Sequence, residues 1–404
     1  MPKIGLSPTQ KGQLNQALKN SKVEQRKESL WKGPSDAGPL GGVTFSSVSK
    51  WLCNREHFRL KMVEGLVKED IFNHSIEFGN MWHVMEECFA SQKQMGACQT
   101  ALKNYVIDLA KKYKEAGTQI NQWYNVCLTQ FPLYVAHWAK NPDVKSREPI
   151  FQEEVFQIPY SLPSGRKIYL RGKFDSVDRI KKGLYIQENK TKSEPDLEQI
   201  ERDLPWDMQT MMYLSVLDLL RQRTYDGSLA TRKELGGDKK ANLGVRYNVI
   251  RRPLSGGKFS IKQKKGRMTK KGPVGVQTAE QFYAELGGII KKNPKHFFIR
   301  FKMEVTKDDL ANFQQKCLNP VLENVLDDYE WWSWCLKNNA VSVFDYTMRK
   351  QMFPAHQNRH YIFPTGIYNP QTEGRGTEYD EYINTGNMRG LVRTDKLFRE
   401  LKDA

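Results

Sequence analysis

The stretch GKFDSVDRIKKGLYIQENKTKS, residues 172–193, decides the fold that we expect for this chain. From residue 167 to residue 180 the side chains alternate between polar and apolar, which is typical of a strand with one buried face. The turn KKG at 181–183 then leads into a second predicted strand, residues 184–190. This stretch therefore predicts two neighbouring strands joined by a tight turn.

Three charged side chains on this hairpin form a candidate catalytic set. Glu188 and Lys190 are two residues apart in a strand, so they project from the same face, and the hairpin can bring Asp175 beside them. Carboxylate oxygens are natural ligands of Mg²⁺ or Mn²⁺, and such an ion activates water and neutralises charge on a phosphate. A lysine there can hold or deprotonate the attacking water. The alternative for an isolated D…ExK pattern is a surface hairpin with ordinary salt bridges.

Helical and strand patterns continue on both sides of the hairpin. The serines of segment 45–49 can cap an N-terminal helix. The further elements expected are a helix at 77–92, two helices between about 100 and 138, a strand at 151–158, a helix at 204–223, a strand at 243–251, a helix after the capping box at 278–281, a strand at 296–305 and a helix from 306 to 334. Strands interspersed with helices in this order predict an α/β fold with a mixed central sheet.

The length of 404 residues suits one domain with extensions or two domains. Residues 1–42 predict a polar, flexible arm that ends in the Pro/Gly-rich segment 33–42. A main domain is expected over residues 43–305, with a helical insertion at about 99–140. Residues 306–404 then form a helical C-terminal extension and a tail.

Composition narrows the class of protein. There are 63 Lys and Arg against 46 Asp and Glu, and the resulting net charge of +17 suits a polyanion such as nucleic acid. The six cysteines include no CxxC pair, and no segment has the pattern of a secretory signal or the length of a membrane span. We therefore expect a cytoplasmic protein with reduced thiols and no membrane association.

A basic segment, residues 251–271, is a candidate surface for nucleic-acid phosphates. The residues expected to bind there are Arg251, Arg252, Lys262, Lys264, Lys265, Arg267, Lys270 and Lys271. The alternative is a solvated loop without a ligand. A tryptophan cluster at 331–334 could stack on bases, but its helical spacing favours a core or an interface.

Further motif residues accompany the hairpin on both sides. In chain order they are Gly79 and His83 on the first predicted helix, Gly172 and Thr191 in the hairpin, and Gln209 and Tyr213 on the helix at 204–223. Gln209 and Tyr213 are four residues apart and so share one helix face. Each pair is weak alone, whereas the ordered set is a strong signal.

This ordered set resembles the RecB-like branch of the PD-(D/E)xK nuclease superfamily. That branch shows a GxxxH helix, a GxxD strand, a D/E-x-K-T strand and a QxxxY helix, and the match here covers residues 44–252. The segment from residue 31 to residue 58 is similar to phage-type nucleases of this kind. The resemblance implies a restriction-endonuclease-like core, a mixed sheet flanked by helices, so that residues 43–305 would be the nuclease domain.

The resemblance also implies roles for these residues. Asp175, Glu188, the backbone carbonyl of Asn189 and His83 would bind the metal, and Lys190 would be the catalytic lysine. Gln209 and Tyr213 would orient the nucleic-acid backbone or the lysine. Glu153 or Glu154 would be a further acidic contributor, and Asp178 would be structural. The alternatives are a core or surface role for His83, a core role for Tyr213 and a capping or solvated role for Gln209.

The function implied is a Mg²⁺- or Mn²⁺-dependent DNA exonuclease acting in recombination, repair or replication. An endonuclease with the same centre and a non-catalytic DNA-binding scaffold are the alternatives. Only Cys53 lies where relatives bind an iron–sulfur cluster, which needs four thiolates, so we expect no cluster. There is no GxxxxGK[ST] loop for a nucleotide, so any helicase or recombinase would be a separate partner.

Overall fold

The computed structural model describes residues 28–53, 55–141, 146–222, 235, 240–255, 261–264, 267–269, 272–338, 379, 382, 387–398 and 401. The chain divides into two compact units. Unit 1 consists of Met1–Asp70, Val155–Gly172 and Asn312–Ala404, and unit 2 of Ile71–Glu154 and Lys173–Ala311. The predicted catalytic residues all belong to unit 2.

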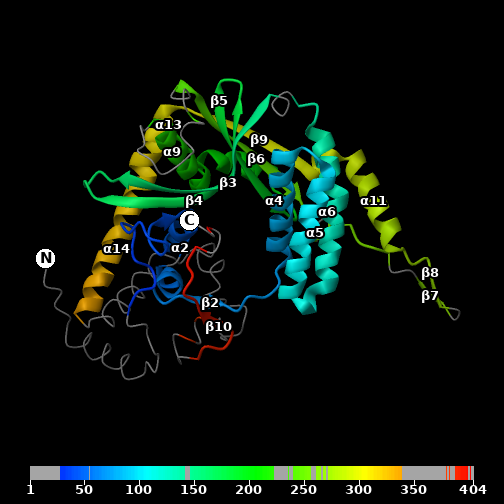
Figure 1. Ribbon diagram of the computed structural model, residues 1–404, viewed down its shortest axis with the longest axis horizontal. Coiled ribbons are helices and arrows are strands. Elements are labelled where there is room, and N and C mark those ends of the chain that lie inside the picture. The colour runs from blue at the N-terminus through cyan, green and yellow to red at the C-terminus, as the bar shows by residue number, and fades with distance from the viewer. Residues whose placement is uncertain are drawn as a thin grey trace. The chain divides into compact units, whose positions relative to one another are not determined.

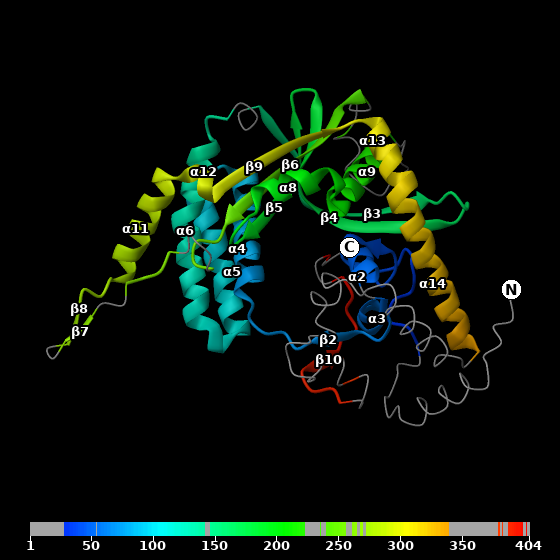
Figure 2. The same cartoon turned by 180° about the vertical axis from the view of Figure 1, so that it is seen from behind.

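Among the described residues, a mixed six-stranded sheet has the order β1-β4-β5-β6-β9, and β3 pairs with β4 outside this path. Its strands are β1 (Val43–Thr44), β3 (Arg147–Ser161), β4 (Lys167–Ile180), β5 (Gly183–Lys192), β6 (Asn242–Arg251) and β9 (Phe298–Val305). β1 runs parallel to β4 and β5 parallel to β6, whereas β4–β5 and β6–β9 are antiparallel. Helices flank this sheet (Figures 1 and 2), which confirms the expected α/β fold.

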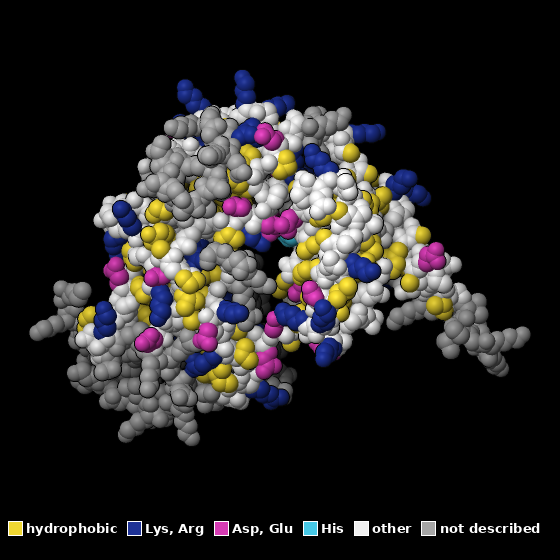
Figure 3. Space-filling model, viewed as in Figure 1, with side chains coloured by type: hydrophobic (Ala, Val, Ile, Leu, Met, Phe, Trp, Pro, Cys, Tyr) yellow, Lys and Arg dark blue, Asp and Glu magenta, His cyan; other side chains and the backbone are white. Residues whose placement is uncertain are grey.

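The β4–β5 hairpin has the boundaries that the alternating pattern predicts for its first strand. Ile180 pairs with Gly183 across the turn, and Ser176 pairs with Gln187 further along. One further step in this antiparallel register places Asp175 opposite Glu188. The exposed lysines of the turn are at the other end of the hairpin, where Figure 3 shows Lys and Arg side chains projecting from the sheet.

Three long helices of unit 2 pack together beside the sheet (Figures 1 and 2): α4 (His74–Gln92), α5 (Met95–Lys112) and α6 (Gly117–Trp138). The short η2 (Lys114–Ala116) connects the last two. Their shared core is aromatic, with the ring centroids of Phe78 and Trp123 5.1 Å apart and those of Trp82 and Phe131 5.2 Å apart. Asn73 caps α4 through its side chain. This packing fixes α4, the helix that carries His83.

Three helical elements follow β5: α8 (Leu197–Asp203), η3 (Leu204–Trp206) and α9 (Met208–Gln222). The sequence predicts one helix over 204–223 and misses α8, which begins after the cap residue Asp196. The first turn of the predicted helix is the separate η3, because Asp207 is extended and starts α9 by accepting a hydrogen bond from the Thr210 backbone. α9 then packs on β5 and β6.

The rest of unit 2 comprises β7 (Arg267–Thr269), β8 (Gly272–Val274), α11 (Ala279–Lys292) and α12 (Pro294–Phe297). α11 starts at the predicted capping box of Thr278 and Gln281, where each side chain accepts a hydrogen bond from the other's backbone N–H. The strand predicted from residue 296 begins two residues later, because α12 occupies the start of that segment.

Unit 1 is built from short elements and one long helix. They are α2 (Phe45–Cys53), α3 (Arg55–Phe58), η1 (Arg59–Val63), β2 (Leu66–Lys68), η5 (Gln314–Leu318), α14 (Asn319–Lys337) and β10 (Leu391–Arg393), with α13 (Lys307–Phe313) leading into it. In the segment expected as an arm, the indole of Trp31 donates to the Gly42 carbonyl. Arg171 donates to the carbonyl of Gly38 and to those of Pro39 and Gly41.

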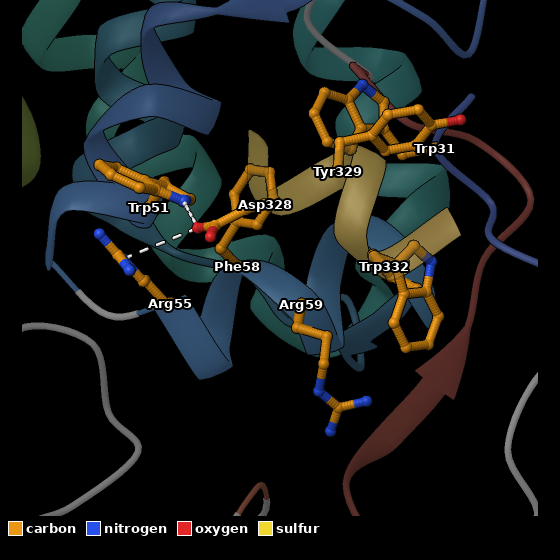
Figure 4. Close-up of a pocket in the computed structure, with 9 residues that line it drawn as sticks. Trp31, Trp51, Arg55, Phe58, Arg59, Asp328, Tyr329 and Trp332 are labelled. Carbon is orange, nitrogen blue, oxygen red and sulfur yellow. Dashed lines mark hydrogen bonds and ion pairs between the residues drawn. The ribbon is translucent and has the colours of Figure 1, made fainter. Parts of the chain in front are cut away.

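A small aromatic pocket in unit 1 shows how α2 and α3 pack against α14 (Figure 4). Trp51 donates its indole N–H to Asp328 at 2.7 Å, and the Arg55 guanidinium lies over the Trp51 ring, 4.2 Å from its centroid. Trp332, from the tryptophan cluster of the sequence, is buried at this pocket, which agrees with a core role. No predicted catalytic residue lines the pocket.

Candidate active site

The predicted helix histidine faces the carboxylates of the sheet. His83 Nδ1 lies 3.3 Å from Glu153 Oε1 and 3.9 Å from Asp175 Oδ2. The donor atoms of these three residues are all within 4.8 Å of one another. α4 approaches β5 closely at Gly79, where an added Cβ would lie 3.5 Å from Thr191 Oγ1. The structure therefore brings the GxxxH helix and the GxxD strand to one site.

The strand β3 supplies the third member of this group through an irregular backbone. Glu153 has φ of 50°, a left-handed value that non-glycine residues rarely adopt, in the middle of a strand. The group of donor atoms includes Glu153 and not Glu154, which favours Glu153 of the two acids that the sequence left open. Its role at a metal site stays a prediction. A backbone irregularity of this kind has no local sequence signature.

Hydrogen bonds of Asn189 connect the hairpin strand β5 to Asp175 and to the neighbouring strand β6. The Asn189 backbone N–H donates to Asp175 Oδ2 at 3.0 Å, which ties the two strands together at the site. The Asn189 side chain accepts from Asn248 Nδ2 at 2.8 Å on the neighbouring strand β6. The metal-binding role of the Asn189 carbonyl stays a prediction.

Lys190 is held between a carboxylate and an amide. Its ammonium group forms an ion pair with Glu188 and donates to Gln209 Oε1 at 3.1 Å. Gln209 Nε2 in turn donates to Glu188 Oε1 at 3.1 Å. The QxxxY helix therefore contributes Gln209 directly to the D…ExK centre, and the alternative of a merely solvated glutamine is wrong.

For Tyr213 the sequence allowed two roles, one in the core and one at the site. Its ring is buried and packs edge-on against Phe174, with centroids 5.6 Å apart, as a core residue would. Burial raises the pKa of its hydroxyl, and the charges of Glu188 and Asp175 raise it further. The core role of the Tyr213 ring is therefore shown, whereas its role in orienting the nucleic acid stays a prediction.

The electrostatics of the centre favour a bound cation. Burial, and then the charge of Asp175, raise the pKa of Glu188 to about 7 despite the neighbouring Lys190. Burial lowers the pKa of His83, but Asp175, Glu153 and Glu188 outweigh it and raise the value to about 9. These carboxylates repel one another out of water, and a divalent ion would relieve that repulsion.

The donor set fits such an ion. Ligands of Mg²⁺ or Mn²⁺ are about 3–4 Å apart when each lies roughly 2.1 Å from the ion. The group of His83, Glu153 and Asp175 comes close to that spacing. Carboxylate oxygens with one imidazole suit Mn²⁺ or Mg²⁺ rather than a soft metal.

Lys173 is a site residue that the sequence reasoning missed. Its ammonium group lies 2.5 Å from Glu153 Oε2, and this contact contributes to holding the pKa of Glu153 below its usual range, although burial opposes the shift. The signal available was its place in the GxxD motif, one residue after Gly172.

Asp178 is structural as expected, because it is buried and paired with Arg246 at 2.6 Å and Arg147 at 2.8 Å.

The basic segment is only partly described. Arg251 is buried, with 3% of its surface exposed, and its guanidinium contacts the His296 ring at 2.6 Å, which disfavours a direct phosphate contact. Arg252 is half-buried, Lys262 is exposed and Lys264 is exposed but paired with Glu285 at 3.2 Å. Lys265, Lys270, Lys271 and the side chain of Arg267 lie outside the described residues.

The structure thus has an α/β core whose hairpin carries Asp175, Glu188 and Lys190. A helix with His83 and a helix with Gln209 lie beside this hairpin. The model of the PD-(D/E)XK nuclease superfamily matches residues 43–320, more than half of the chain. The chain therefore belongs to the PD-(D/E)XK nuclease superfamily, whose members are metal-dependent nucleases. The fold is consistent with the restriction-endonuclease-like core that we expected.

The search for similar curated proteins gave no match. No helix among the residues that the structure describes combines the length and apolar character that a membrane span requires.

Proposed function

We propose that this protein is a DNA exonuclease of the RecB-like, phage-type branch that uses Mg²⁺ or Mn²⁺. The observation that carries the proposal is the arrangement around Lys190, whose ammonium group is oriented by both Glu188 and Gln209. A lysine held beside buried metal-binding carboxylates is what in-line attack of water on a phosphate requires.

Each side chain of the centre has a distinct role in this proposal. His83, Asp175 and Glu188 would hold the ion with the Asn189 carbonyl, and Glu153 would add a fourth side-chain ligand. A bound ion would activate water and neutralise charge on the phosphate. Lys190 orients the attacking water and faces the charge that develops on the phosphate. Gln209 keeps Lys190 in place, and Tyr213 orients the strand.

The proposed setting follows from the charge of the chain and from the resemblance. The protein would act in the cytoplasm, in the host cytoplasm if a phage encodes it, on single-stranded DNA or duplex ends. A separate helicase or recombinase would expose these ends during recombination, repair or replication. The net charge of +17 supports binding to such a polyanion.

The test is cleavage of end-labelled linear DNA and closed-circular DNA with Mg²⁺ or Mn²⁺, for the wild type, Lys190→Ala and Lys182→Ala. Lys182 is exposed at the hairpin turn, eight residues from Lys190, and so serves as a matched control. We expect metal-dependent loss of the linear substrate only, reduced at least about 100-fold in Lys190→Ala and unchanged in Lys182→Ala.

Other results would point elsewhere. Attack on the closed circle would make the enzyme an endonuclease with the same centre. A folded wild-type protein that binds DNA and cleaves neither substrate would support a scaffold instead. Equal activity in Lys190→Ala would move the catalytic centre away from this hairpin.

A further inference from the structure

Trp206 is the most exposed large apolar side chain among the described residues, with 80% of its surface accessible. Single exposed hydrophobic residues are common on protein surfaces, so its position has to decide whether it has a function. Trp206 ends η3, directly before the helix that carries Gln209. The tryptophans that the sequence singled out lie on α14, in the other unit.

The segment around Trp206 is anchored on both sides. Leu204, two residues earlier, is buried, and its carbonyl accepts a hydrogen bond from the Asp207 backbone at 3.1 Å. Asp207 also accepts from the Thr210 backbone N–H at 2.8 Å, which fixes the start of α9. The backbone that carries the exposed indole is therefore anchored, so little backbone freedom would be lost on binding a ligand.

Trp206 is close in the chain to a residue of the candidate centre. Gln209, three residues further along, contacts both Lys190 and Glu188. Three peptide units span at most roughly 11 Å, so the Cα atoms of Trp206 and Gln209 can be no further apart. The Trp206 backbone therefore lies within roughly 11 Å of the backbone of Gln209, at the start of the helix that contributes to the centre.

The charges near Trp206 favour a base over a phosphate. The exposed acidic residues of segment 194–203 are Glu194, Asp196, Glu198, Glu201 and Asp203, and the basic residue in this segment is Arg202, which pairs with Asp203 at 3.0 Å. Such a surface repels the phosphate backbone. A nucleobase, in contrast, is uncharged and stacks on an aromatic ring.

We infer that Trp206 is a stacking platform for one nucleobase of single-stranded DNA, next to the phosphate that is cleaved. This inference rests on the proposed nuclease function and adds how the strand is held at the centre. Stacking on a π face tolerates every base, so the platform would not create a sequence preference. A paired base in a duplex is already stacked, so the platform selects an unpaired strand.

The test combines variants of the protein with abasic positions in the substrate. Single-stranded oligonucleotides that lack one base, at each position in turn, are compared with the intact strand by kcat/KM in Mn²⁺ and by affinity in Ca²⁺. The proteins are the wild type, Trp206→Ala, Trp206→Phe and Trp334→Ala. Trp334 is also exposed, at 49%, and is the control for loss of a surface indole.

We expect the wild type to lose about tenfold in kcat/KM and in affinity when one particular base is missing. Trp206→Ala should show that same loss on the intact strand and no further loss at that abasic position. Trp206→Phe should recover most of the loss, and Trp334→Ala should behave like the wild type. Because Trp206 is exposed, these variants should unfold at the wild-type temperature.

Two outcomes separate this inference from the proposed function. If Trp206→Ala keeps the wild-type sensitivity to every abasic position, the indole does not stack on the strand, even though the enzyme cleaves. If the wild type never cleaves but its affinity in Ca²⁺ shows the coupling between Trp206 and one base, the platform stands and the nuclease proposal fails. A wild type that binds no single-stranded DNA overturns the inference.

Discussion

At the scale of single residues, the centre keeps like charges close together out of water. Glu188 has 4% of its surface exposed and lies opposite Asp175 in the hairpin register. Burial and Asp175 together make its negative charge costly, which is why its pKa is raised to about 7. The geometry that makes this charge costly in the metal-free protein would favour the binding of a cation.

The raised pKa of Glu188 predicts how stability depends on pH. In metal-free protein the folded state binds this proton more tightly than the unfolded chain, whose glutamate has a pKa near 4.5. The free energy of unfolding should therefore fall between pH 5 and 6.5, and Glu188→Gln should remove this slope, on the order of 2 kcal/mol. Urea denaturation in EDTA at both pH values measures it.

Glu148→Gln, at an exposed glutamate of β3, should keep the wild-type slope. The interval ends at pH 6.5 because the two states differ increasingly in the proton on His83 as the pH reaches and passes that value. A slope that persists in Glu188→Gln would show that a group other than Glu188 causes it.

His83 predicts the pH dependence of metal binding. A metal ion needs the neutral imidazole, whereas the raised pKa of about 9 keeps the metal-free ring protonated at neutral pH. The apparent affinity for Mn²⁺ should therefore rise with pH from 7 to 9, by up to about tenfold per unit. In His83→Ala the affinity should fall at least about tenfold and lose part of this pH dependence.

Isothermal titration with Mn²⁺ at several pH values measures both effects. His74→Ala is a matched control on the same helix α4, nine residues earlier and at its first position. An affinity that is unchanged in His83→Ala would remove this histidine from the ligand set.

At the scale of elements, the irregularity in β3 falls at Glu153, the acid that lies beside His83. The left-handed backbone at Glu153 turns its side chain toward His83, where a regular strand would alternate the faces of 153 and 154. The strain at this position is stored where the proposed ligand is needed.

This strain predicts an inverted preference between two substitutions. Glu153→Gly should be more stable than Glu153→Ala by about 1 kcal/mol, because glycine adopts φ of +50° without a steric cost. Strand positions normally favour alanine over glycine, and both variants lack the carboxylate, so the comparison isolates the backbone. Thermal melts measure it; an alanine variant that is as stable as the glycine variant would show a relaxed backbone at this position.

At the scale of the whole molecule, the basic residues that produce the net charge of +17 differ in whether they can contact a ligand. Some basic side chains are internal, such as Arg246 beside Asp178, and cannot contact a strand. Others are exposed, such as Lys262 on the basic segment. Net charge therefore predicts a polyanionic partner but not the residues that touch it.

The salt dependence of DNA binding should separate two neighbouring lysines. Lys262→Ala should reduce the slope of log affinity against log salt by about 0.7, the loss of one contact to a single strand. Lys264→Ala should reduce it less, because Lys264 pairs with Glu285 at 3.2 Å. Affinity in Ca²⁺ between roughly 50 and 200 mM salt measures both slopes. Equal slopes in the two variants and the wild type would place the strand away from this segment.

The sequence by itself determined the hairpin, its tight turn and the residues that meet on it. Alternation of side chains and the turn at 181–183 are local properties, so β4 has the predicted bounds. The two-residue spacing of Glu188 and Lys190 fixes one face, and the antiparallel register then sets Asp175 against Glu188. Capping residues such as Thr278 likewise fixed the start of a helix from local hydrogen bonds.

Only the tertiary structure decided the rest. The choice of Glu153, the contact of Lys173 with it and the burial of Arg251 depend on elements distant in the chain. Trp206 is exposed whereas Trp332 is buried, although both are tryptophans in helical segments. The physical reason is that periodicity reports backbone hydrogen bonding within an element, whereas burial, strain and charge coupling arise when elements pack against one another.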